Sequence, residues 1–144
     1  MGQINLARVV GGGLLAGLIM NISEYVLHAI ALGPDGERLL EEWQKLGLVG
    51  DPDPMMLLLL VLATFALGIM AVWTYAAIRP RFGAGVGTAA CAGLLVWALS
   101  YLYAALYVHA GVLVYPPRLT WLPVAWSLIE VPVATIAGAW IYRE

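Results

Sequence analysis

The chain is 144 residues long, and 62% of its residues are hydrophobic whereas only 11% are charged. Soluble domains carry about 25% charged residues, so this composition excludes an ordinary soluble protein and predicts an integral membrane protein. The formal net charge of −2 argues against a nucleic-acid-binding surface, and the single cysteine, Cys91, excludes an intrachain disulfide.

The first apolar segment runs over about residues 4–32, which exceeds the roughly 20 residues needed to cross a bilayer. Its polar side chains follow a stripe of small residues at steps of three and four, made of Gly13, Gly17, Asn21, Glu24 and His28. Such steps place side chains on one face of a helix. We therefore expect this face to point into a helix interface and not into lipid.

The next segment is polar and rich in proline and glycine, and it separates the first two spans. Within it, apolar residues recur at helical spacing between acidic ones over about residues 36–47, at Leu39, Leu40, Trp43 and Leu46. This pattern predicts a short amphipathic helix that lies on the membrane surface. Two alternatives are a connector helix packed on the bundle and a lid over a site beneath it.

The second and third spans are predicted over about residues 55–78 and 84–114, joined by the basic turn "RPRFG". Gly68 lies on a small-residue face of the second span, where it can allow close helix packing. In the third span, His109 shares a helix face with small residues, and Tyr101 offers a hydroxyl nearby. The third span thus brings a second histidine toward the helix interface.

The fourth span is predicted over about residues 119–142, after the proline turn "YPPR". Glu130 lies near its middle and shares a face with Trp126 and Ser127. Pro132 leaves the carbonyl of Leu128 without its usual helical partner and favours a kink beside Glu130. The sequence as a whole therefore predicts an all-α bundle of four transmembrane helices with an amphipathic helix in the first outer loop.

Four ionisable residues on three spans form the candidate site: Glu24, His28, His109 and Glu130. Such groups are costly inside a membrane and need partners, and the lysines and arginines all lie near span boundaries. Two histidines and two carboxylates suit zinc, iron or manganese, so the leading hypothesis is a site that binds a metal ion or a proton. Asn21, Tyr101 and Ser127 are expected to support it.

Other functions remain open at this point. His28 and His109 alone can be the two axial ligands of a haem. A small proton-coupled carrier can use Glu24 as its coupling carboxylate. A structural or accessory subunit needs the polar groups only to fix helix packing, either in a homo-oligomer or in a larger membrane complex. No nucleophile motif or phosphate-binding loop is evident, so the sequence indicates neither catalytic residues nor whether the protein is an enzyme.

Orientation follows from basic residues near the span ends. Arg8, Arg79, Arg81 and Arg143 fall on one side and Arg38, Lys45 and Arg118 on the other. This small bias predicts that both termini are cytoplasmic.

Three stretches carry a resemblance to other proteins: "GLIMNISEYVLHAIALG", "AVWTYAAIRPRFGAGVGTAACAGLLVW" and "EVPVATIAGAWIYRE". Together they cover much of the chain, which resembles a class of small uncharacterised four-span bacterial inner-membrane proteins. The resemblance implies a multi-pass location in a bacterial inner membrane. It implies no assigned activity, so no catalytic residues carry over.

Overall fold

The computed structural model describes residues 4–50, 53–111 and 116–142, and every element in these ranges is helical. In chain order the elements are α1 (Leu6–Val26), η1 (Leu27–Ala31), α2 (Gly33–Lys45), α3 (Pro54–Phe82), α4 (Val86–Trp97), η2 (Ala98–Leu102), α5 (Tyr103–Gly111) and α6 (Pro117–Ile141). The elements η1 and η2 are single π-helical turns that continue α1 and join α4 to α5.

Four of the described helical segments are long and apolar enough to cross a membrane. They cover Leu6–Ala31, Pro54–Phe82, Val86–Ala110 and Pro117–Ile141. The predicted all-α, four-span architecture is confirmed. Helix α3, which is the second span, runs four residues beyond the predicted end at 78, because Pro80 is accommodated within its last turn. The helix ends at Phe82, just before Gly83, which has a φ of 85°.

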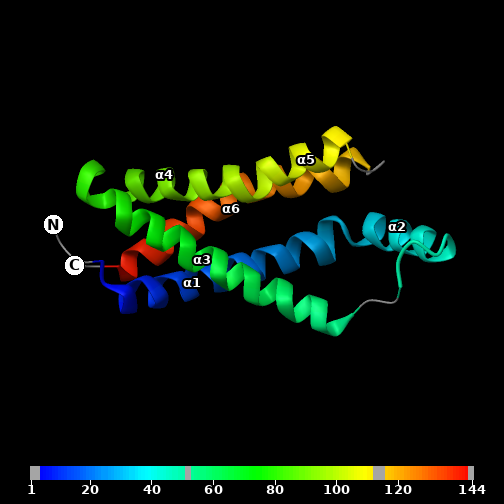
Figure 1. The fold of residues 1–144 in the computed structure, drawn as a ribbon, viewed down its shortest axis with the longest axis horizontal. Helices are drawn as coiled ribbons and strands as arrows, with labels where there is room; N and C mark the ends of the chain where they lie inside the picture. The colour runs from blue at the N-terminus through cyan, green and yellow to red at the C-terminus, as the bar shows by residue number, and fades with distance from the viewer. Residues whose placement is uncertain (1–3, 51–52, 112–115, 143–144) are drawn as a thin grey trace.

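The four long helices run roughly along one axis, with α2 projecting beyond them (Figure 1). The start of α1, the end of α6 and the α3–α4 turn lie at one end, which we call the terminal end. The end of η1, the start of α3 and the start of α6 lie at the other, which we call the loop end. Side-by-side packing of α1 with α3, α1 with α6 and α4 with α6 holds the bundle together.

Glycines let the helices touch backbone to backbone in the terminal half, which comprises α1 up to Met20, α3 from Phe65, α4, and α6 from Pro132. A Cβ atom on Gly17 would lie 2.7 Å from Cα of Phe65, and one on Gly68 would lie 2.5 Å from the carbonyl oxygen of Gly13. Larger side chains therefore cannot occupy these positions without moving a helix. The buried core surrounds these contacts and includes Val9, Ala16, Met20, Ala71, Val72 and Ala134.

The remainder of the bundle is the loop half, and here α1 and α3 diverge (Figure 1). The side chains of Met55, Met56 and the four leucines at 57–60 are all exposed in the monomer, as expected for a surface that contacts lipid. The capping side chain of Asp53 accepts a hydrogen bond from the backbone N–H of Met55 at 2.9 Å and fixes the start of α3. The start of α3 in the loop half thus lies away from the packed core.

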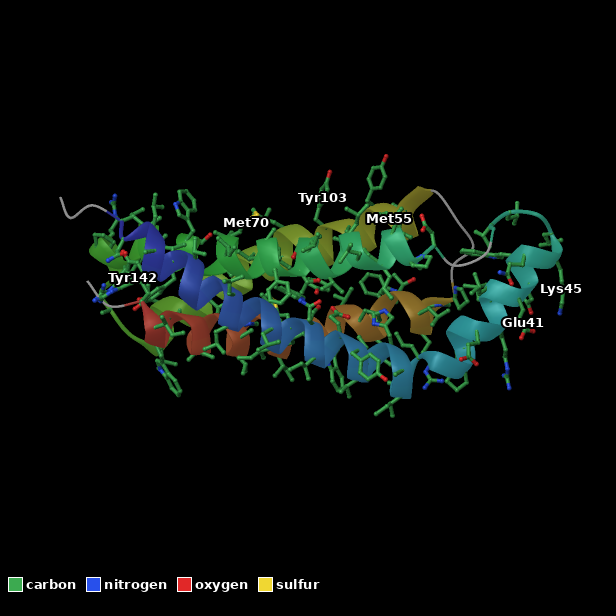
Figure 2. The ribbon with its side chains drawn as sticks, turned by 90° about the horizontal axis from the view of Figure 1, so that it is seen from below. Glu41, Lys45, Met55, Met70, Tyr103 and Tyr142 are labelled. Carbon is green, nitrogen blue, oxygen red and sulfur yellow. The ribbon has the colours of Figure 1, made fainter. Side chains whose placement is uncertain are left out.

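Helix α2 begins at Gly33, three residues before the predicted start, with Pro34 in its first turn. Figure 2 shows Glu41 and Lys45 of this helix at the opposite end of the molecule from Tyr142. Near the start of α2, the guanidinium of Arg118 in α6 lies 2.6 Å from the carboxylate of Asp35. The position of α2 on the membrane surface stays a prediction.

Candidate functional site

Glu24 lies in the last turns of α1, and its side chain is 20% exposed. The hydroxyl of Tyr101, from η2, donates a hydrogen bond of 2.6 Å to Oε1 of this carboxylate. Nδ1 of His28 lies 3.3 Å from Oε2 and 2.9 Å from the backbone carbonyl oxygen of Glu24. Both carboxylate oxygens of Glu24 therefore have a donor-type partner.

Glu130 of α6 has the opposite environment. Its residue is only 6% exposed, and neither carboxylate oxygen has a hydrogen-bond partner among the described residues. Ser23 and Trp126 lie beside it, but Nε1 of Trp126 donates its hydrogen bond of 2.8 Å to Oγ of Ser23 instead. Glu24 and His28 are close enough to Glu130 to interact with it electrostatically. The structure thus brings together three of the four predicted ionisable residues around one region.

Both π-helical turns contribute to this region. His28 lies within η1, and Tyr101 lies within η2. A π-turn carries one more residue per turn than an α-helix, and such turns occur frequently at functional sites. Here the two turns supply the two side chains that contact Glu24.

Asn21 and Ser127, predicted as supporting residues, make different kinds of contact. Nδ2 of Asn21 donates to the carbonyl oxygens of Gly17 at 2.9 Å and Val61 at 3.4 Å. It therefore links α1 to α3 three residues before Glu24. Ser127 is fully buried and donates to the carbonyl of Pro123, four residues earlier in its own helix, at 2.7 Å. Asn21 therefore adjoins the site, whereas Ser127 satisfies backbone within α6.

The fourth predicted residue, His109, lies elsewhere. It is exposed on α5, and its ring packs edge-on against Trp121 with ring centroids 5.5 Å apart. Within the described ranges, no hydrogen bond or ion pair joins it to Glu24, His28 or Glu130. The described residues as a whole contain no group of three or more histidine, cysteine, aspartate or glutamate side chains placed to hold a metal ion. The metal and haem hypotheses stay predictions.

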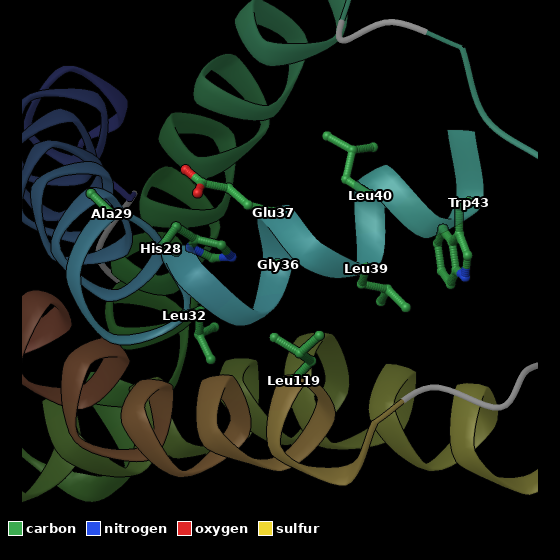
Figure 3. A pocket seen from close by; sticks show the side chains of 10 residues that line it. His28, Ala29, Leu32, Gly36, Glu37, Leu39, Leu40, Trp43 and Leu119 are labelled. Carbon is green, nitrogen blue, oxygen red and sulfur yellow. The ribbon is translucent and has the colours of Figure 1, made fainter. Parts of the chain in front are cut away.

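Two cavities adjoin the site, and His28 lines both of them. The first, of about 580 Å³, lies between α2 and the start of α6, and we call it the α2 cavity. Figure 3 shows Leu32, Leu39 and Leu119 directed into this space, with Trp43 further along α2. His28 is 64% exposed in its side chain, so it connects this outer cavity with the carboxylate of Glu24.

The second cavity, of about 620 Å³, lies where α1 and α3 diverge, and we call it the α1–α3 cavity. Its polar lining comes mainly from α1 and η2, and its apolar wall comes from α3. The residues that line it are Asn21, Glu24, Tyr25, His28, Leu57, Leu60, Val61, Thr64 and Tyr101. Glu24 therefore faces an open space as well as its two partners.

Sequence reasoning missed Ser23 as a contact of the site. A usable signal was present, because Gly12, Ala16 and Ser23 recur at steps of four and seven and define a second stripe on α1. Gly12 at one end of this stripe meets the backbone of Gly138 in α6, and Ser23 at the other meets Trp126. One helix thus uses adjacent faces to pack against α3 and α6.

Comparison with protein families, curated proteins and solved structures finds no match to this chain.

Proposed function

We propose that this integral membrane protein belongs to a bacterial inner membrane and that Glu24 and Glu130 form a site that binds and exchanges a proton. The single observation that supports the proposal most strongly is Glu130. It is a buried carboxyl group with no hydrogen-bond partner in the part of the chain that the structure describes.

The physical argument rests on the contrast between the two acids. An ionised carboxylate without partners in an apolar site is strongly unfavourable, whereas a proton removes the charge. Glu24 has Tyr101 and His28 as donors, which stabilise the ionised form. Two neighbouring carboxyl groups in such different environments are suited to opposite protonation states, as in many acid–base sites.

The proposal includes a route for the proton. In the proposed exchange, the Glu130 carboxyl gives its proton to the Glu24 carboxylate, which becomes neutral, and Glu130 becomes the anion. Glu24 lines the α1–α3 cavity, where its carboxyl group can release the proton to water, while His28 keeps its Nδ1–H as a donor to Glu24. A proton-coupled carrier needs a relay of this kind between an internal carboxyl group and one surface.

The proposal is tested by infrared spectroscopy of the full chain in lipid discs at neutral pH. We expect the carbonyl stretching band of a protonated carboxylic acid. The band should disappear in Glu130→Gln and persist in Glu24→Gln and in Glu41→Gln, a control in the exposed helix α2. A spectrum without the band, or a band that Glu130→Gln leaves unchanged, would contradict proton binding at Glu130.

The rival interpretations give different results in companion measurements. A site for zinc, iron or manganese predicts about one ion per purified chain by elemental analysis, lost in both Glu24→Ala and His28→Ala. Haem ligation predicts a Soret band. A structural subunit predicts no protonated acid and a defined complex or oligomer by mass measurement. Proton exchange requires none of these.

A further inference from the structure

We infer that the α1–α3 cavity binds a lipophilic organic cation with an ammonium group, held against the carboxylate of Glu24. This inference rests on the proposed function, in which Glu24 is the ionised member of the pair. It adds a ligand class to a site that otherwise handles only a proton.

The size and walls of the cavity suit a small molecule with an apolar body. Its volume of about 620 Å³ falls within the usual range of ligand pockets, about 300–1,000 Å³. Leu57, Leu60 and Val61 of α3 form an apolar wall that faces the polar side chains of α1. A ligand with one polar end and one apolar end would satisfy both walls.

The hydrogen-bond roles of the polar side chains that line the cavity determine which sign of charge it favours in a ligand. Nδ2 of Asn21 is bonded to two carbonyl oxygens, so its amide orientation is fixed and its oxygen faces the other way. The Thr64 hydroxyl donates to the carbonyl of Leu60 at 3.0 Å, and the Tyr101 hydroxyl donates to Glu24. These three groups have used their donors within the protein.

What they leave for a ligand is a set of acceptors: the lone pairs of the Asn21, Thr64 and Tyr101 oxygens, together with the Glu24 carboxylate. His28 also lines the cavity, but its Nδ1 is turned toward Glu24. The Tyr25 hydroxyl is a further lining group, and no lysine or arginine is among the lining residues. Such a lining repels an anion and favours a cation or a strong donor. Tyr25 and Tyr101 also line the cavity, and aromatic rings favour a cation nearby.

The cation that fits best is organic rather than metallic. One carboxylate with neutral oxygens is a poor cage for a divalent ion, and the described residues place no three strong ligands together. The leucine wall would gain nothing from a small hydrated ion but would desolvate the body of a lipophilic amine. The ammonium group can belong to a free amine or to a lipid headgroup, because the cavity opens where α1 and α3 diverge.

Benzyltrimethylammonium is the probe, measured by equilibrium dialysis against the full chain in discs of an uncharged glycolipid, with empty discs subtracted. We expect saturable binding at one probe per chain. Glu24→Gln should weaken the affinity about tenfold or more, because the partly desolvated ion pair is lost. Val61→Phe should weaken it by filling the cavity, whereas Glu41→Gln should leave it unchanged.

Absence of saturable binding, or equal affinity in Glu24→Gln, would overturn the inference. If the infrared band of Glu130 is present in the same samples, the proposed proton site survives that failure. Circular dichroism verifies that each variant is folded, and Glu24→Asp, which keeps the charge, should retain binding if Glu24→Gln does not fold. Repeating the titration in phosphatidylethanolamine discs separates the two sources: a weaker apparent affinity there assigns the natural ammonium group to a lipid headgroup, and an unchanged affinity assigns it to a free amine.

Discussion

The terminal and loop halves of the bundle are built from the same four helices but in opposite ways. In the terminal half, glycines bring backbones into contact, and the core is small and apolar. In the loop half, α1 and α3 diverge, the start of α3 is exposed, and two cavities surround polar side chains. Close packing and polar chemistry are therefore separated along the helix axes.

This separation has an energetic reason. Membrane helices associate through close packing of small residues, so the terminal half can hold the fold together. Buried polar groups and open cavities lower stability, and functional sites commonly include them. The unpartnered carboxyl group of Glu130 thus lies outside the half in which glycines bring the helices into contact.

The largest expected effect tests the packed half. Gly68→Leu should lower the free energy of unfolding by about 3 kcal/mol or more, because its Cβ alone would meet the backbone of Gly13 and Gly17. Denaturation of the protein in mixed micelles measures this change. Gly87→Leu is the matched control, since a Cβ at Gly87 meets nothing within 4 Å and should cost little. Equal stability of the two variants would contradict the contrast between the halves.

A change of opposite sign is expected in the open half. Glu130→Leu should raise the free energy of unfolding by about 1–3 kcal/mol, because it removes a buried carboxyl group that lacks hydrogen bonds. Glu24→Leu should lower it, since the partners Tyr101 and His28 lose their acceptor. The same micelle denaturation measures both. A loss of stability in Glu130→Leu would mean that Glu130 has a stabilising partner.

The hydrogen bond between α1 and η2 should contribute less. Tyr101→Phe removes only the hydroxyl and should lower the free energy of unfolding by about 1 kcal/mol, a typical value for a polar contact between membrane helices. Tyr103→Phe is the control, because Tyr103 is exposed on the neighbouring turn (Figure 2). Identical denaturation curves for the two variants would show that the Tyr101–Glu24 contact contributes nothing to stability.

The smallest effect concerns the tether of α2. Arg118→Ala removes an exposed ion pair with Asp35 and should change the stability of the bundle by less than about 1 kcal/mol. Hydrogen exchange should nevertheless become faster in the first turn of α2 and stay unchanged in α4. Unaltered exchange in α2 would mean that its apolar contacts alone hold it in place.

Helical periodicity predicted the four spans and the α1 stripe, because composition and spacing determine which face is small or polar. It failed for His109, which was assigned to an inward face by counting along an uninterrupted α-helix. The face from which the count started, with Gly87 and Cys91, is itself exposed, and α4 packs instead through Ala89, Ala92, Gly93 and Val96. The π-helical turn at Ala98–Leu102 shifts the count further. No feature of the local sequence announces the π-turn, because it forms where tertiary packing fits an extra residue.

Ser127 failed for a different reason. It does lie on a buried face of α6, but a serine hydroxyl in a helix can donate to the carbonyl four residues earlier, and here it does so. Spacing identifies the face on which a residue lies, but it cannot show whether a hydroxyl turns toward a neighbouring helix or toward its own backbone. The geometry of the acid pair, with one member partnered and one not, required the three-dimensional structure.

The π-helical turn at η2 also marks a place where the chain can change length. Because this turn holds one residue more than an α-helical turn, deleting a single residue such as the exposed Leu99 would leave enough chain for a regular α-helix. The hydrogen-bonded ladder would close again and the helices on either side would keep their faces, because the wide turn had absorbed the extra residue, but the side chains within the turn, Tyr101 among them, would change direction. A homologue lacking one residue here would keep four spans and present different side chains to Glu24, so a single-residue deletion can change the site while the fold is retained.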